Sequence, residues 1–174
     1  ENNLTMLMGA WVNGDEKPTR KEIDTLIKLV NENKDIVKAV IVGNEALLRG
    51  DLSDKKLSEY IKEVKTALPD IQVTYADVWE YWVKYPEIKN LTDFVTIHIL
   101  PYWEDDPMNI SESIKHLAEV RHEVEVILGT SNILIGETGW PSEGRMREDA
   151  MPSKINQAKF VREFVTLAEE KGWR

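Results

Sequence analysis

Cysteine is absent from the 174-residue sequence, and histidine occurs only three times. Without cysteine, the chain forms no disulfide, binds no metal through thiolates and has no cysteine nucleophile. His98, His116 and His122 do not have the spacing of a metal-binding motif, and we interpret the last two as solvated surface residues. We therefore expect no metal site, and the sequence indicates no other cofactor.

Basic side chains and long apolar runs are also scarce. The 22 Lys and Arg residues are outnumbered by 31 Asp and Glu residues, which gives a formal net charge of −9. Such a chain repels the phosphate backbone of nucleic acid and the anionic surface of a membrane, so we expect neither as a partner. No apolar run reaches the roughly 20 residues that span a bilayer. We expect no membrane span and no signal peptide in this sequence.

Short apolar runs alternate with segments of helical periodicity along the whole sequence. The runs predict strands over residues 4–12, 37–42, 72–76, 94–100 and 133–135. Thr19 and Glu22 indicate a capping box for the first intervening helix, and Ser153 indicates an N-cap for the last helix. The alternation is typical of βαβ units around a parallel sheet, in a single domain over residues 1–174. A closed (β/α)8 barrel requires eight strands and about 250 residues, so the sequence predicts an open sheet or an incomplete barrel.

Two of the predicted strands are followed within three residues by a glutamate. Apolar residues lead into Gly43-Asn44-Glu45 and again into Gly136-Glu137, so each run places one carboxylate at its carboxyl end. In parallel barrels this end carries the loops that bind substrates. Glycoside hydrolysis requires two carboxylates, one to protonate the departing oxygen and one to attack or stabilise the anomeric carbon. The alternative is that each glutamate only caps a helix or pairs with Lys or Arg.

Neighbouring side chains favour the catalytic interpretation. Asn44 offers an amide to a sugar hydroxyl, and Trp140 offers a flat apolar ring to a pyranose. Trp79, Tyr102 and Trp103 follow other predicted strands and are further candidates for sugar binding, although such aromatics also pack under loops. We interpret the acidic run over residues 104–106 as a solvated loop without a chemical role, with the lining of an acceptor subsite as the alternative.

The segments Val42-Gly43-Asn44-Glu45 and Gly136-Glu137-Thr138-Gly139-Trp140-Pro141-Ser142 resemble the two signature motifs of glycoside hydrolase family 17. The resemblance covers essentially the whole chain and suggests a bacterial type of member. It implies a (β/α)8 TIM barrel, of which this chain provides roughly the third to the seventh strand. It also implies Glu45 as the acid/base, Glu137 as the nucleophile, a β-1,3-glucan substrate and a location outside the cytoplasm.

The resemblance is incomplete at the fourth predicted strand. This strand ends in His98-Ile99-Leu100-Pro101-Tyr102-Trp103, whereas many plant members have Asn-x-Tyr-Pro there, so either His98 or Tyr102 takes the place of the tyrosine near the nucleophile. The implied reaction is double displacement with retention. Water as the acceptor makes the protein a β-1,3-glucanase, and a second glucan makes it a glucanosyltransferase. A non-catalytic glucan-binding module or inactive fragment is the remaining alternative, and self-association through open sheet edges is a further expectation.

Overall fold

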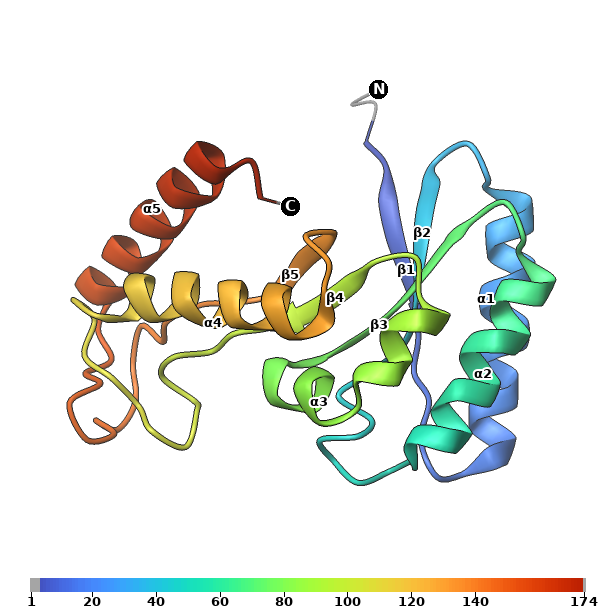
Figure 1. Cartoon of the computed structure of the whole chain (residues 1–174), viewed down its shortest axis with the longest axis horizontal. Helices are drawn as coiled ribbons and strands as arrows, with labels where there is room; N and C mark the ends of the chain where they lie inside the picture. Colours follow the sequence, from blue (N-terminus) through green and yellow to red (C-terminus); the bar gives the residue numbers. More distant parts are fainter. Residues whose placement is uncertain (1–3, 174) are drawn as a thin grey trace. The chain divides into compact units, whose positions relative to one another are not determined.

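The computed structural model describes residues 4–173, and strands alternate with helices throughout them (Figure 1). The chain forms two compact units that meet in sequence between Thr96 and Ile97. The elements of the first unit are β1 (Met6–Ala10), α1 (Glu16–Glu32), β2 (Val37–Asn44), α2 (Asp54–Ala67), β3 (Gln72–Val78), α3 (Trp79–Lys84) and the 3-10 helix η1 (Pro86–Leu91). The strand β4 (Val95–His98) crosses the boundary, and α4 (Ser113–Leu128), β5 (Ile133–Glu137) and α5 (Lys154–Lys171) follow.

The five strands of residues 4–173 occupy the sheet in chain order, β1-β2-β3-β4-β5. β1 pairs with β2 and β2 pairs with β3 in parallel. A parallel sheet whose order never reverses is typical of a (β/α) barrel, whereas a doubly wound sheet reverses its order at a switch point. All five predicted strands are present. β2, β3 and β5 extend further than predicted, to Asn44, Val78 and Glu137, whereas β1 and β4 are shorter than the predicted runs over residues 4–12 and 94–100.

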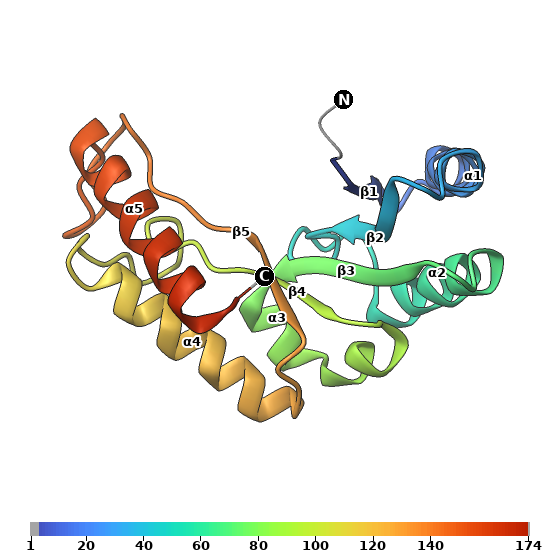
Figure 2. The same ribbon diagram turned by 90° about the horizontal axis from the view of Figure 1, so that it is seen from above.

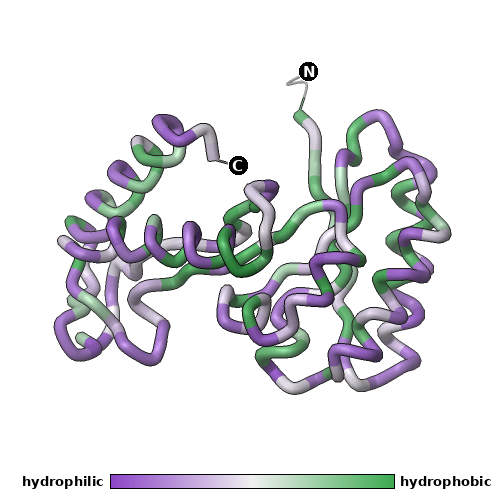
Figure 3. The backbone as a smooth tube through the Cα atoms, in the orientation of Figure 1, coloured by the Kyte–Doolittle hydropathy of each residue, from purple (hydrophilic) through white to green (hydrophobic). Residues whose placement is uncertain are grey.

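Two amphipathic helices cover the strands of the first unit. In both ribbon views, α1 and α2 lie along the same side of β1, β2 and β3 (Figures 1 and 2). Hydrophobic and hydrophilic positions alternate along both helices (Figure 3), because their apolar residues recur at the helical repeat. The residues that these helices bury are Thr19, Ile23, Leu26 and Val30 on α1 and Leu57, Tyr60, Ile61 and Val64 on α2. The burial of these residues packs both helices against the strands of the first unit, and the carboxyl ends of these strands carry candidate site residues.

The second unit packs α5 against α4, and the predicted N-cap of α5 is present. Ser153 is the N-cap of α5, and its Oγ accepts a hydrogen bond from the backbone N of Asn156 at 3.0 Å, as predicted. Gly129 ends α4 in the left-handed conformation that glycine adopts without steric cost. No helix within residues 4–173 combines the length and the hydropathy needed to cross a membrane.

The predicted capping box at the first helix is wrong. α1 begins at Glu16, and the side chain of Asp15 accepts a hydrogen bond from the backbone N of Lys17 at 3.2 Å. Thr19 instead lies buried inside the helix, and its hydroxyl donates to the backbone O of Asn13 at 3.1 Å. Pro18 explains the shift, because proline fits the first turn of a helix and the cap must therefore precede it.

Candidate active site

Glu45 lies directly after β2 in a turn that glycine makes sterically accessible. A Cβ atom at Gly43 would lie 2.7 Å from Cγ2 of Val12 and 3.3 Å from Cε2 of Tyr75, so only glycine fits at this position. Glu45 itself has a φ of 52°, in the left-handed region that glutamate rarely adopts. Such a conformation costs about 1 kcal/mol or more, and it persists only where the surroundings enforce it.

Backbone and guanidinium hydrogen bonds enforce the turn. The backbone N of Glu45 donates to the backbone O of Ala76 on β3 at 2.8 Å. Arg49 donates from Nη1 to the backbone O of Asn44 and from Nε to Oδ2 of Asp51 at 2.8 Å. The guanidinium of Arg49 also lies over the ring of Trp11, 4.2 Å from its centroid. Hydrogen bonds therefore connect the turn after β2 to β3 and also connect residues within the turn.

A buried tyrosine and aspartate on β3 complete the support of this turn. The hydroxyl of Tyr75 donates to Oδ2 of Asp77, and both residues are almost fully buried. The backbone N of Leu47 donates to the Tyr75 hydroxyl at 2.9 Å, and the backbone N of Leu48 donates to Oδ2 of Asp77 at 3.4 Å. Burial raises the pKa of the Asp77 carboxyl, as does the nearby carboxylate of Glu45, while the hydrogen bonds that it accepts oppose the rise. Burial also raises the pKa of the Tyr75 hydroxyl, and the charge of Asp77 acts in the same direction.

Trp79 follows β3 as the first residue of α3 and is half-buried. Its indole Nε1 is buried and has no hydrogen-bond acceptor among residues 4–173. The neighbouring Trp82 is different, since its Nε1 donates to the backbone O of Thr96 at 2.8 Å and its ring is fully buried. Trp82 is thus a core residue, and Trp79 remains a candidate for sugar binding.

The second unit places two predicted site residues side by side. His98 ends β4 and Glu137 ends β5, and the backbone N of Ile99 donates to the backbone O of Glu137 at 3.1 Å. Nε2 of His98 lies 3.8 Å from Oε1 of Glu137, too long for a hydrogen bond but close enough for electrostatic attraction to a protonated imidazole. The His98 side chain is 1% exposed and the Glu137 side chain is 54% exposed, so the carboxylate remains open to solvent.

Three of the predicted aromatic residues form one cluster in the second unit. The ring of Tyr102 lies edge-on to Trp103, with centroids 5.0 Å apart, and to Trp140, with centroids 5.9 Å apart. Trp103 is 48% exposed, so its ring is available to a sugar. Trp140 is only 2% exposed, packs against Phe160 and donates from Nε1 to the backbone O of Met151 at 3.0 Å. The ring of Trp140 therefore packs inside the unit and presents no open face.

Hydrogen bonds join this aromatic cluster to the loop after β5. The Tyr102 hydroxyl donates to the backbone O of Arg145 at 2.5 Å. In the opposite direction, Nη1 of Arg147 donates to the backbone O of Tyr102 at 2.6 Å. The segment after β4 and the segment after β5, which follow His98 and Glu137 respectively, thus support each other.

The interpretation of Glu104 and His116 as solvated residues is wrong. The side chains are only 13% and 24% exposed, and Nε2 of His116 lies 2.7 Å from Oε2 of Glu104. Oε1 of Glu104 also accepts a hydrogen bond from the backbone N of Leu100 at 3.2 Å. The pair anchors the segment that carries Tyr102 and Trp103 to α4. These long-range contacts have no local signal in the sequence.

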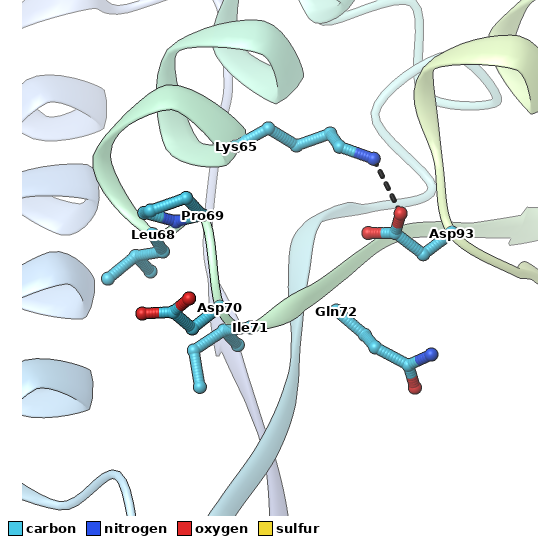
Figure 4. A pocket seen from close by; sticks show the side chains of 7 residues that line it. All are labelled: Lys65, Leu68, Pro69, Asp70, Ile71, Gln72 and Asp93. Atoms are coloured by element: carbon cyan, nitrogen blue, oxygen red, sulfur yellow. Dashed lines mark hydrogen bonds and ion pairs between the residues drawn. The ribbon is translucent and has the colours of Figure 1, made fainter.

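A shallow pocket in the first unit lies at the other end of β3 from the candidate residues. Its lining includes Gln72 at the start of the strand and Asp93 just before β4, and Lys65 pairs with Asp93 through an Nζ to Oδ1 distance of 2.6 Å (Figure 4). Asp77 and Val78 end the same strand, so about 20 Å of extended chain separates them from this pocket. In barrel enzymes this amino-terminal end serves stability, and we assign the pocket no chemistry.

The sequence pattern of the BtgE/BtgC glycoside hydrolase domain matches residues 1–173. The chain belongs to this family. It is 27% identical over 180 residues to the glucan 1,3-beta-glucosidase of Saccharomyces cerevisiae, covering 93% of this chain and 57% of the relative. It is 30% identical over 154 residues to the probable glucan endo-1,3-beta-glucosidase btgC of Aspergillus fumigatus, covering 82% of this chain and 22% of the relative.

Solved structures confirm the predicted fold class. The crystal structure of a glycoside hydrolase family 17 beta-1,3-glucanosyltransferase from Rhizomucor miehei superimposes with a TM-score of 0.85 at 29% identity and covers 97% of this chain. An active-site mutant of the Rhizomucor miehei enzyme in complex with laminaritriose gives a TM-score of 0.86 at 28% identity. The BtgE/BtgC domain described here has the architecture of part of a (β/α)8 barrel. It spans 63% of each of those chains and somewhat more than half of the first curated relatives.

Proposed function

We propose that the protein is a retaining enzyme of β-1,3-glucan, in which Glu137 is the nucleophile and Glu45 is the acid/base. The observation that carries the proposal is the placement of these glutamates, each directly at the carboxyl end of a parallel strand in a BtgE/BtgC glycoside hydrolase domain. The carboxyl ends of barrel strands are where barrel enzymes carry out their chemistry. The β-1,3-glucan specificity is supported by the names of the relatives and by the laminaritriose that the Rhizomucor miehei mutant binds.

The reaction proceeds in two displacements. In the first, the Glu137 carboxylate forms a bond to the anomeric carbon while the glycosidic C–O bond breaks and Glu45 donates its proton to the departing oxygen. In the second, the Glu45 carboxylate removes a proton from the acceptor, whose oxygen bonds to the anomeric carbon and releases Glu137. Two inversions give overall retention, and we expect the two carboxyl groups about 5–5.5 Å apart, as in other retaining enzymes.

The residues around each glutamate support distinct roles in this reaction. The buried imidazole of His98 lies beside Glu137 and orients the nucleophile. The half-exposed ring of Trp103 provides a stacking surface for a glucosyl unit, and Tyr102 holds that ring edge-on. Asn44, immediately before Glu45, offers its amide to a sugar hydroxyl.

Turnover of laminari-oligosaccharides by the full-length protein tests the proposal. We expect the first product detected by NMR to have the β configuration, because the mechanism retains it. Mass spectrometry then identifies the acceptor: products longer than the substrate indicate glucanosyl transfer, and only shorter products indicate hydrolysis. An α-configured first product contradicts the mechanism, and binding without any turnover supports a glucan-binding module instead.

A further inference from the structure

Backbone N–H groups in the turn that carries Glu45 find their acceptors on the neighbouring strand, β3. Those of Glu45, Leu47 and Leu48 donate in order to the Ala76 carbonyl, the Tyr75 hydroxyl and the Asp77 carboxylate. We propose that Tyr75 and Asp77 are positioning residues for Glu45, which hold its carboxyl at the orientation that proton transfer requires. This inference rests on the proposed function, in which Glu45 is the acid/base.

The hydroxyl of Tyr75 connects the turn to the carboxylate. It accepts from the backbone N of Leu47 and donates to Oδ2 of Asp77, so it uses both hydrogen-bonding capacities at once. Asp77 is equally committed, since Oδ1 accepts from the backbone N of Val78 at 2.8 Å while Oδ2 accepts from Tyr75 and Leu48. Removing the hydroxyl would leave the buried N–H of Leu47 without an acceptor, and the turn would relax to recover one.

The strained backbone makes Glu45 sensitive to such relaxation. Its φ of 52° persists only because the flanking hydrogen bonds enforce it. If the turn relaxes towards a more common conformation, the Cα–Cβ bond of Glu45 points in another direction. A general acid must lie within hydrogen-bond reach of the oxygen that it protonates, so a displacement of about 1 Å lowers the rate of that step.

Thr74 provides a matched control on the same strand. It is fully buried, and its hydroxyl donates to the backbone O of Phe94 at 2.8 Å and lies 3.0 Å from Oγ1 of Thr96. Thr74→Val therefore removes a buried hydroxyl from β3, as Tyr75→Phe does, but it leaves the hydrogen bonds of the Glu45 turn intact. If the Tyr75 hydroxyl only stabilises the fold, Tyr75→Phe and Thr74→Val should change the enzymatic activity in the same way.

The test compares two substrates on the same preparations of the full-length protein. A laminari-oligosaccharide needs a proton on its leaving group, whereas the β-fluoride of laminaribiose releases fluoride without one. We expect Tyr75→Phe and Asp77→Asn to lower kcat/KM for the oligosaccharide about 10- to 100-fold and to keep kcat/KM for the fluoride within about threefold of the wild type. Thr74→Val should change neither by more than about threefold. For each variant, kcat/KM for the oligosaccharide divided by kcat/KM for the fluoride does not depend on the fraction of protein that is folded.

Equal losses on both substrates, or a ratio for Tyr75→Phe that matches the ratio for Thr74→Val, would overturn the positioning role. Those outcomes leave the proposed function standing, because the wild type still acts on both substrates. If the wild type acts on neither substrate, the proposed function and the positioning role both fail.

Discussion

The imidazole of His98 lies 3.8 Å from the carboxylate of Glu137, and only the carboxylate is exposed. Adjacent strands hold the two residues in register, through the hydrogen bond from the backbone N of Ile99 to the backbone O of Glu137. A nucleophile needs an open path to the anomeric carbon and a fixed orientation. The exposure of the Glu137 carboxylate leaves such a path open, and we propose that the adjacent imidazole of His98 favours one orientation of it.

Replacing Glu137 by glutamine should abolish turnover of β-1,3-glucan without unfolding the protein. The amide keeps the shape of the side chain but loses the charge that attacks the anomeric carbon, so we expect kcat to fall by roughly a thousandfold or more. The matched control is Glu143→Gln, because Glu143 is an exposed residue of the loop that follows β5. Steady-state kinetics and a thermal melt on both variants check the prediction. Comparable losses in the two variants would contradict the role of Glu137.

Glu45→Ala should respond to azide in a way that identifies the acid/base. With an activated aryl glucoside, the leaving group needs no proton, and azide attacks the glycosyl-enzyme without help from a base. We expect azide to restore turnover of this variant and to give a β-glycosyl azide, as NMR can show. Rescue of Glu137→Ala with a retained product would show instead that the two glutamates have exchanged roles.

Replacing Trp140 by alanine should mainly lower stability, whereas replacing Trp103 by alanine should mainly weaken substrate binding. Trp140 is buried against Tyr102 and Phe160, so its truncation should lower the free energy of unfolding by about 3–5 kcal/mol. Trp103 is half-exposed, so its truncation should cost less than about 1 kcal/mol of stability and raise KM for glucan by roughly two- to tenfold. Denaturant unfolding and kinetics distinguish the two effects. An unchanged KM in Trp103→Ala would exclude it from substrate binding.

The buried carboxyl of Asp77 predicts a pH dependence of stability. Burial raises its pKa in the folded state, so the folded protein binds this proton more tightly than the unfolded chain does, where the pKa is about 3.9. The contribution of this group to stability is complete below the unfolded pKa and is lost as pH rises through the folded pKa. The free energy of unfolding of the wild type, minus that of Asp77→Asn, should therefore decrease as pH rises from about 4. Asp70→Asn provides the control, because it makes the same chemical change at an exposed position.

The arrangement of strands and helices was predictable because it depends on local patterns. An apolar run such as residues 37–42 predicts a buried strand whatever lies beside it, and five such runs separated by amphipathic helices predict a parallel sheet. The structure confirms these elements. The N-cap at Asp15 was missed because Thr19 and Glu22 also fit a capping pattern, and Pro18 decides between the two sites.

The support of the site was not predictable, because it depends on contacts between distant residues. Glu45 and Glu137 were predicted as catalytic residues from the strand ends and their motifs, whereas the pattern around Tyr75 and Asp77 indicated only a strand and the residues that follow it. Their partners Leu47 and Leu48 lie 28 and 29 residues away in sequence. A tyrosine and an aspartate two positions apart share one face of a strand, and this is the local signal that could have identified them.

Covalent trapping on the protein is the decisive test of Glu137 as the nucleophile. A 2-deoxy-2-fluoro β-fluoride of laminaribiose should inactivate the full-length protein with time, because the 2-fluoro substituent slows release of the glycosyl-enzyme more than its formation. Peptide mass spectrometry should then find one added disaccharide on Glu137. A label on Glu45, or turnover of β-1,3-glucan with inversion and no label on either glutamate, would contradict the account.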